Sequence, residues 1–244
     1  MKISVVIPVL NERASLPATI AALRSCRGIT EIIVADGGST DDTVQWLQAQ
    51  PDIVLVRSIR GKGPQINVGA AAAFGVAGPA DISDIALLFL HADSLISQPA
   101  IDALHAALAD PQLAGGAFYI RFAESRPRFL RLVAWGINVR ARFRNSATGD
   151  QGIFVRKPVF ESIDGAPEWP LFEDVELVRR IKRAGKFTVL RTPLTVSGRR
   201  YIEHGVFRTA LLIYSLRFAY WLGVPPQRLK SWFRDARTDQ QSRD

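Results

Sequence analysis

The first half of the sequence alternates short apolar runs with longer segments of helical pattern. Four runs rich in β-branched residues predict strands at residues 3–9, 31–35, 53–56 and 85–90. Helical patterns follow them at residues 15–26, 41–50, 64–77 and 98–110. Strands that are apolar along their whole length and separated by helices are typical of a parallel sheet covered on both faces. The alternation therefore predicts an α/β fold with a mostly parallel, Rossmann-type sheet covered by helices.

Polar residues gather directly after each predicted strand. The segment LLFLHADS at residues 87–94 passes from an apolar run straight into His91 and Asp93. Any one of these strand ends is explained by a turn, a helix cap or a flexible loop. Ligands of parallel sheets bind beyond the carboxyl ends of the strands, so four polar endings on one edge favour a functional cleft. The polar residues are Asn11, Glu12, Asp36, Arg60, Lys62, Asn67, His91 and Asp93.

Composition limits the class of protein. A hydrophobic content of 48% excludes a disordered chain, and the sequence has no internal repeat. The single cysteine, Cys26, cannot form an internal disulfide, which favours a reducing, cytoplasmic setting. The segment MKISVVIPVL lacks the long apolar core and cleavage site of a signal peptide, and we expect it to be the first strand.

Charge is distributed unevenly along the chain. Residues 1–120 hold 7 Lys or Arg against 11 Asp or Glu, whereas residues 121–244 hold 24 against 12. The second half therefore has a formal balance of +12. A basic half favours an anionic partner such as a phosphate group, a nucleic acid or an acidic membrane surface, although a solvated basic face is also common.

Several motifs resemble the family 2 glycosyltransferases, which have the GT-A fold. The motifs are VVIPVLNE, IIVADGGSTDDT and LHADS, followed by GDQGIFVRK at 149–157 and FEDVELVRRIKRAG at 172–185. The resemblance extends from residue 2 to about residue 200. It implies a nucleotide-sugar-binding half at residues 1–120 and an acceptor-binding, catalytic-base half of the same domain at residues 121–200. Residues 201–244 are then a C-terminal helical extension that faces the acceptor or a membrane.

The resemblance implies a nucleotide-diphosphate sugar as donor and Mg²⁺ or Mn²⁺ as cofactor. The family usually has Asp-x-Asp after the fourth strand, and the second acid, here Asp93, supports the metal. His91 stands in place of the first acid. The resemblance places His91 near the donor ribose or diphosphate. A divalent cation held by one carboxylate and the phosphates would stabilise the departing diphosphate. The implied nucleotide-sugar-binding residues are Pro8, Glu12, Asp36, Lys62, Asn67, His91 and Asp93.

Individual donor contacts are also implied by the resemblance. Asp36 would accept a hydrogen bond from the nucleotide base, with Pro8 and Glu12 bordering the base and ribose. Lys62 lies between glycines and could bring its ammonium group to the diphosphate. Arg199 and Arg200, followed by Tyr201, loosely match a basic and aromatic motif that closes over the diphosphate in some relatives.

The acceptor hydroxyl must lose a proton as it attacks the sugar, and a carboxylate can take that proton. By the resemblance Asp174 is this general base, and Glu173 supports or contacts the acceptor. The alternative is that both acids only stabilise a helix N-terminus electrostatically. The further acceptor-side residues are Asp150, Gln151 and Trp169.

Two later segments combine apolar residues with arginines. Residues 126–144 have a helical apolar stripe at 129, 132, 133, 136 and 137 surrounded by arginines. Residues 206–224 are apolar nearly all round, and two arginines inside the segment make a membrane span costly. We expect an in-plane helix at the surface of an anionic membrane or, equally, a core helix of the acceptor lobe.

These observations favour a cytoplasmic, metal-dependent, inverting glycosyltransferase of the hexosyltransferase type. We expect a membrane-associated or lipid acceptor, and inversion is implied by the family. A sugar nucleotidyltransferase is the main alternative, but PVLNERASL after the first strand lacks its glycine-rich phosphate loop. A non-catalytic sugar-nucleotide-binding protein remains open because of His91. A nucleic-acid-binding protein is disfavoured, since the arginines alternate with apolar helix faces.

Overall fold

The computed structural model describes residues 1–73, 84–124, 128–198, 201–202 and 206–230. Seven strands form one sheet in the order β3-β2-β1-β4-β6-β5-β7. The strands are β1 (Lys2–Val9), β2 (Glu31–Asp36), β3 (Ile53–Arg57), β4 (Ile85–Phe89), β5 (Leu113–Phe122), β6 (Ile153–Arg156) and β7 (Lys186–Val196). The first four are parallel, β6 runs antiparallel to both of its neighbours, and β7 is parallel to β5. The predicted α/β fold with a mostly parallel sheet is confirmed.

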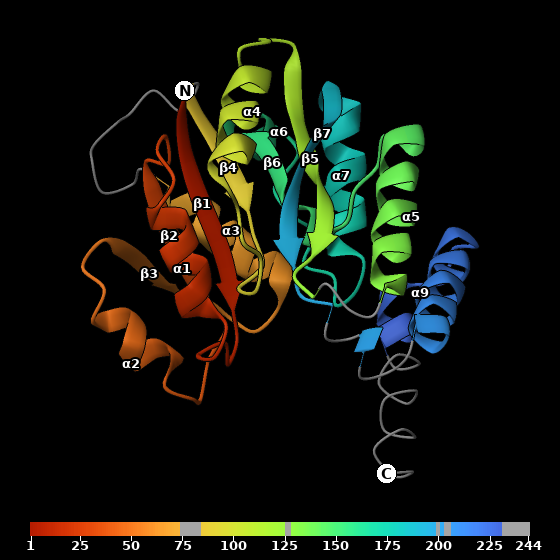
Figure 1. Ribbon diagram of the computed structural model, residues 1–244, viewed down its shortest axis with the longest axis horizontal. Coiled ribbons are helices and arrows are strands. Elements are labelled where there is room, and N and C mark those ends of the chain that lie inside the picture. The colour runs from red at the N-terminus through yellow and green to blue at the C-terminus, as the bar shows by residue number, and fades with distance from the viewer. Residues whose placement is uncertain (74–83, 125–127, 199–200, 203–205, 231–244) are drawn as a thin grey trace.

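Helices connect and cover the strands (Figure 1). They are α1 (Leu16–Arg24), α2 (Thr43–Gln48), α3 (Lys62–Ala72), α4 (Gln98–Leu108), α5 (Phe129–Arg144), α6 (Lys157–Ser162), α7 (Glu173–Ala184) and α9 (Val206–Trp221). The four strands and four helices predicted in the first half are present, with ends that differ by a few residues. The predicted end of the third helix, beyond residue 73, lies outside the described residues.

Successive residues of β1 pack into different cores on the two faces of the sheet. Val5 and Ile7 belong to a core that includes Leu16 of α1 and Leu104 of α4. Val6 between them belongs to a second core, together with Ile66 of α3 and residues of α6 and α7. Since side chains alternate across a strand, an entirely apolar strand must be covered on both faces. This double cover explains why the first strands have no polar alternation.

Strand β5 was not predicted because its sequence, LAGGAFYIRF, contains two adjacent glycines. A Cβ atom at Gly115 would lie 2.4 Å from the backbone oxygen of Phe154 in β6. A Cβ at Gly116 would lie equally close to the ring of Phe154. Glycine therefore permits a close approach of two strands here, although it weakens the sequence pattern of a strand.

Side chains replace a strand along part of β5. Strand β6 pairs with β5 only at Gly115 and Gly116. Beyond them, Asn138 of α5 exchanges two hydrogen bonds of 2.9 Å with the backbone of Ile120, and Gln151 donates one of 3.0 Å to the oxygen of Phe118. Buried backbone groups need such partners. These contacts attach α5 and the 149–151 turn to the sheet.

The carboxyl ends of β1, β2 and β4 lie on one edge of the sheet, at the bottom of Figure 1. Helices α5 and α9 lie at the opposite side of the view from α1 and α2 (Figure 1). Among the helices in the described ranges, none has the length and hydropathy needed to cross a membrane.

Candidate active site

His91, the second residue after β4, makes contacts through both of its ring nitrogens. Its Nε2 lies 3.0 Å from Nζ of Lys62, at the start of α3, and its Nδ1 lies 3.1 Å from Oδ1 of Asp150. An ammonium group can only donate hydrogen bonds, so we assign Nε2 as the acceptor and Nδ1 as the nitrogen that carries hydrogen. The ring thereby bridges a cation on α3 and a carboxylate on the turn η2 (Gly149–Gln151).

The two acids at the start of α7 have different surroundings. Oδ2 of Asp174 accepts a hydrogen bond of 2.7 Å from the backbone amide of Gly149. The side chain of Glu173 is buried. Burial and the charge of Asp174 raise the pKa of Glu173 above its ordinary value, while the nearby charge of Lys62 opposes the rise. One carboxylate is thus oriented by the backbone, and its neighbour is destabilised in its ionised form.

Phe172 positions these acids. It precedes α7 with a φ of 65°, in the left-handed region that bulky residues rarely adopt. Its ring packs against Tyr220 of α9 with a centroid distance of 5.1 Å, and Leu216 of α9 belongs to the same cluster. Such strain persists only where surrounding packing enforces it. Helix α9 therefore supports the first turn of α7.

Residues from opposite halves of the sequence line one pocket. Pro8 of β1, Lys62 of α3 and His91 meet Glu173 and Asp174 of α7 around it. The rest of the lining consists of Ile66, Phe89, Leu90, Gly149, Ile153 and Leu177. Three of the predicted donor residues are therefore brought together with the predicted general base, whereas Glu12, Asp36, Asn67 and Asp93 are not part of the pocket lining. The sequence interpretation missed Gly149, although it lies within the GDQG motif.

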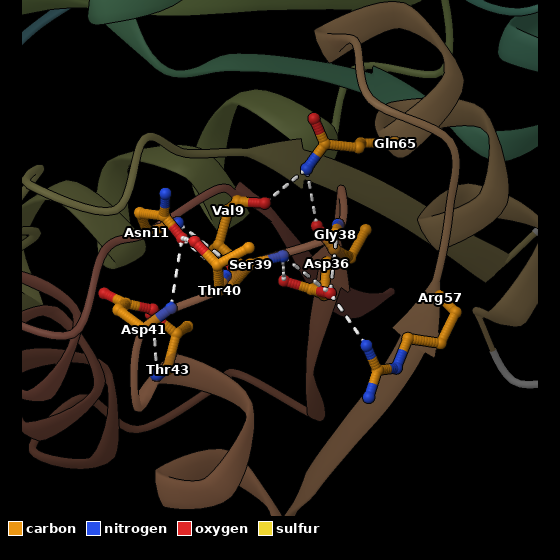
Figure 2. Close-up of polar contacts among 11 residues, drawn as sticks. Val9, Asn11, Asp36, Gly38, Ser39, Thr40, Asp41, Thr43, Arg57 and Gln65 are labelled. Carbon is orange, nitrogen blue, oxygen red and sulfur yellow. Dashed lines mark hydrogen bonds and ion pairs between the residues drawn. The ribbon is translucent and has the colours of Figure 1, made fainter.

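Asp36 lies at the end of β2 and is fully buried (Figure 2). Its carboxylate accepts hydrogen bonds of 3.1 Å from the amides of Gly38 and Ser39, and it pairs with Arg57 at 3.2 Å. Next to this loop, Nε2 of Gln65 donates to the backbone oxygens of Val9 and Ala35 at 2.7 and 2.8 Å (Figure 2). These contacts hold the ends of β1 and β2 and the helix α3 together.

Asn11 joins the loops that follow β1 and β2. Its Oδ1 accepts a hydrogen bond of 2.7 Å from the backbone amide of Thr40. The backbone amide of Asn11 donates to the hydroxyl oxygen of Ser39 (Figure 2). Glu12, beside it, accepts a hydrogen bond of 2.6 Å from Ser15. The loops that the sequence placed at the edge of a cleft are therefore bound to one another.

The remaining predicted residues have structural contacts. Asn67 exchanges two hydrogen bonds with the backbone of Ala166, at 2.8 and 2.9 Å. Gln151 is fully buried, and its side chain supports the turn from beneath. Trp169 packs against Tyr220 with ring centroids 6.3 Å apart. The predicted Arg199 and Arg200 lie outside the described residues.

A divalent cation would find one exposed carboxylate, that of Asp93, on the segment after β4. Within the described part of the chain, no three His, Cys, Asp or Glu side chains are grouped closely enough to hold a metal. Mg²⁺ and similar hard cations are commonly held by one or two carboxylates together with substrate phosphates and water. The single carboxylate of Asp93 therefore fits a metal ion that is also held by the phosphates of a substrate.

Comparison with known proteins identifies relatives of this fold. A model of the family described as Glycosyl transferase family 2 matches residues 4–163. No curated protein matches the sequence. Among solved structures, S. aureus TarS 1–349 in complex with UDP has a TM-score of 0.61 and 17% identity over 81% of this chain.

Two further structures extend the comparison. TarS 1–349 with UDP-GlcNAc has a TM-score of 0.59 and 18% identity over 81% of this chain. The mannosyltransferase PcManGT from Pyrobaculum calidifontis, in complex with GDP-Man and Mn²⁺, has a TM-score of 0.55 and 23% identity over 78% of this chain. The chain spans 60% of the UDP-bound TarS chain, 58% of the UDP-GlcNAc-bound chain and 54% of the mannosyltransferase.

Proposed function

The chain belongs to glycosyltransferase family 2, and we propose that it transfers a hexose from a nucleotide-diphosphate donor to an acceptor hydroxyl with inversion. The similarity to solved glycosyltransferases confirms the GT-A fold. One observation carries the proposal. Lys62 and His91, from the donor half, line the same pocket as Glu173 and Asp174, from the acceptor half. Cationic and acidic groups are therefore adjacent at this place, which supports a reaction there between a donor diphosphate and an acceptor hydroxyl.

The donor would lie along the carboxyl edge of the sheet, with Pro8 and Glu12 beside the base and ribose. Asp36 would accept from the base in addition to its contacts within the loop, since a carboxylate has about four acceptor positions. Asn67, which holds the backbone of Ala166, would border the donor side. Arg199 and Arg200 are proposed to contact the diphosphate, which leaves with a negative charge.

Lys62 is proposed to bind that diphosphate. Its ammonium group donates toward His91 and lines the pocket, so it can also donate to a phosphate oxygen. His91 would hold Lys62 in place and connect it to Asp150 on the acceptor side. In this role His91 positions a cation by accepting a hydrogen bond from it. The acid that the family usually has at this place would position a cation by electrostatic attraction.

A metal ion, Mg²⁺ or Mn²⁺, would be held by Asp93 and the donor phosphates, and it would stabilise the negative charge of the leaving diphosphate. The mannosyltransferase relative was solved with Mn²⁺. Lys62 and Asp93 would then approach the diphosphate from different elements, α3 and the segment after β4.

Asp174 would remove the proton from the acceptor hydroxyl. The acceptor oxygen then forms a bond to the anomeric carbon while the bond to the diphosphate oxygen breaks, and the diphosphate keeps the bonding electrons. Attack from the side opposite the leaving group inverts the configuration. The amide of Gly149 orients the carboxylate. The proposed acceptor side consists of Glu173, Asp150, Gln151 and Trp169. Of these, Gln151 would act indirectly by supporting the 149–151 turn, and Trp169 by supporting the loop before α7.

A thermal-shift screen of UDP, GDP, ADP and CDP, each with and without Mn²⁺, tests the donor class. Ligand at a hundred times its dissociation constant contributes about 2.7 kcal/mol. A shift of about 5–10 °C is expected for the correct nucleotide in the presence of Mn²⁺, since each kcal/mol raises the Tm of a chain this size by about 2–4 °C. Absence of any shift contradicts the proposal.

Transfer itself is tested with the sugar derivatives of the nucleotide that binds, by the release of nucleoside diphosphate. Preference for a nucleoside triphosphate and a sugar phosphate, with release of pyrophosphate, would instead show a nucleotidyltransferase. Binding without release of diphosphate to any acceptor or to water would indicate a non-catalytic sugar-nucleotide-binding protein.

A further inference from the structure

Helix α5 exposes large apolar side chains on one side. Leu132, Trp135 and Phe143 have exposed fractions of 66%, 63% and 82%. Their spacing of three and eight residues places them on one side of the helix, whereas Leu130, Ala134 and Ala141 are buried on the other. Of the expected apolar stripe at 129, 132, 133, 136 and 137, positions 129, 132 and 136 are exposed, and positions 133 and 137 are half-buried. The buried face of α5 consists of different residues, and the outward face is apolar as well.

Arginines surround this outward face. Arg128, Arg131, Arg142 and Arg144 are exposed. Residues 128–144 contain five arginines and no Asp or Glu. Exposed contiguous apolar side chains on a folded protein mark a contact with a partner or a membrane. The charge of that partner must be negative, since all formal charges of this segment are positive.

Helix α9 has a second exposed apolar face. Leu211, Phe218 and Leu222, the last just beyond the helix, have exposed fractions of 73%, 60% and 63%. Leu212 and Leu216 of the same helix pack toward Phe172 and Leu229. Residues 206–224 contain two arginines and no acid. The side chains of Phe207 and Tyr214, within the expected apolar segment 206–224, lie outside the described part of the chain.

An open groove adjoins α5 and adds to this surface. Its volume is about 470 Å³, and its lining includes the aromatic rings of Phe122 and Trp135. Arg121 and Arg131 line it as well. Its one acid, Glu124, already accepts a hydrogen bond of 2.7 Å from the amide of Gly198. The groove therefore offers aromatic surface beside two cations.

We propose that the outward faces of α5 and α9 form a docking surface for an anionic lipid bilayer. Amphipathic helices bind in the plane of a bilayer when their apolar side chains enter it and their basic residues meet acidic headgroups. Trp135 and the arginines suit the level of the headgroups, where aromatic and basic side chains are enriched. This inference does not depend on the proposed activity.

Two other occupants fit the surface less well. A second copy of the chain would bring the same arginines together, because a twofold interface pairs a patch with itself. A nucleic acid would satisfy the charge but leave the exposed leucines without apolar partners. Of these three occupants, the anionic bilayer matches both the charge and the apolar side chains. The inner side of α9 contacts Phe172, the residue before Glu173, so α9 connects the docking surface to the start of α7.

Cosedimentation of the full chain with vesicles tests the proposal. Vesicles of 30% phosphatidylglycerol in phosphatidylcholine are compared with vesicles of phosphatidylcholine alone. We expect binding to rise with the anionic lipid content and to weaken at 0.5 M NaCl without vanishing, since salt screens charge but does not weaken apolar insertion. No binding to the anionic vesicles, or equal binding to both kinds, overturns the proposal.

Three variants identify the surface. The combined change Leu132→Ser, Trp135→Ser and Phe143→Ser should weaken binding to anionic vesicles at least tenfold, and Leu211→Ser with Phe218→Ser should weaken it similarly. Ile59→Ser is the matched control, because Ile59 is 71% exposed and lies outside both helices. Unchanged binding of both apolar variants overturns the proposal.

The third variant, Arg128→Gln, tests the charges. It should bind about fivefold more weakly, which corresponds to about 1 kcal/mol for one basic residue near an anionic surface. Circular dichroism must show native helix content in each variant. This result is expected, because the substituted side chains are exposed in the folded protein. Light scattering that showed a dimer dissociated by the α5 variant would overturn the proposal in favour of a second copy.

Discussion

The backbone amide of Gly149 donates a hydrogen bond of 2.7 Å to Oδ2 of Asp174, across 25 positions of the sequence. The next residue, Asp150, contacts His91, which in turn contacts Lys62. One short turn thus touches the proposed general base and the proposed diphosphate-binding side of the pocket. Changes in this turn should therefore affect both the removal of the acceptor proton and the binding of the donor diphosphate.

A methyl group at Gly149 tests this coupling. A Cβ there would lie 2.8 Å from Nε2 of His91 and 3.5 Å from Oδ2 of Asp174. Gly149→Ala should therefore displace the imidazole and reduce kcat/KM by about 10- to 100-fold, as small misplacements of reacting groups do. The imidazole can shift, so the Tm should change little. Gly136→Ala is the control, because nothing lies within 4 Å of its Cβ, and wild-type activity is expected. Full activity of Gly149→Ala would contradict the coupling.

Asp174→Asn should leave the dissociation constant of the nucleotide diphosphate near that of the wild type. Transfer should fall by about 10²–10⁴-fold, the usual contribution of a general base. The amide oxygen can still accept the hydrogen bond from Gly149, so the start of α7 should be retained. Single-turnover rates and the Tm are the measurements. Transfer at the wild-type rate would assign the acid to the helix N-terminus alone.

Asp93→Asn tests the metal. The amide has nearly the same shape as the carboxylate but no charge, so the variant should fold normally and lose the effect of Mn²⁺ on nucleotide-diphosphate binding. The thermal shift with and without Mn²⁺ measures this effect without relying on turnover. A Mn²⁺-dependent shift that equals that of the wild type would place the metal elsewhere.

Lys62→Met removes the cation that contacts His91. Loss of a charge-assisted hydrogen bond costs about 1.5–3 kcal/mol, so nucleoside diphosphate should bind about ten- to a hundredfold more weakly. The nucleoside itself, which has no phosphate, should bind as before. Arg60→Met controls for the loss of a positive charge in the same loop, and calorimetric titration gives both constants. A loss of affinity that is equal for nucleoside and diphosphate would indicate a structural role for Lys62.

Glu173→Gln tests the buried acid through pH. Because burial and Asp174 raise the pKa of Glu173 in the folded state, its ionisation destabilises the fold as the pH rises above the ordinary glutamate range. The neutral amide avoids this loss. The Tm of the variant should therefore exceed that of the wild type by a margin that widens as the pH rises from the ordinary glutamate range to the raised pKa of Glu173, and that stays constant at higher pH. A constant difference across this range would show that Glu173 keeps an ordinary pKa.

The sequence alone determined the parallel part of the fold. Apolar runs and helical periods depend on residues that are close in the chain, so β1 to β4 and their helices could be predicted to within a few residues. The polar groups after those strands were also evident, because parallel strands bring their carboxyl ends to one edge. Family motifs added Asp93 and Asp174 as candidates, and their roles remain predictions.

The second half depended on contacts that no local pattern encodes. Strand β5 contains Gly115 and Gly116, whose use is clear only from the approach of Phe154. The apolar residues of α5 could be counted in the sequence, but its inward and outward faces were decided by Asn138, which fills the unpaired edge of β5.

Tertiary structure also decided how the proposed site is assembled. Lys62, His91, Asp150 and Asp174 come from four separate parts of the chain, and their distances follow from the order of strands in the sheet. Residue types limit which chemistry is available, because ionisable groups are local properties of the sequence. Their orientation and the raised pKa of Glu173 arise from burial and from neighbouring charges, which exist only once the chain has folded.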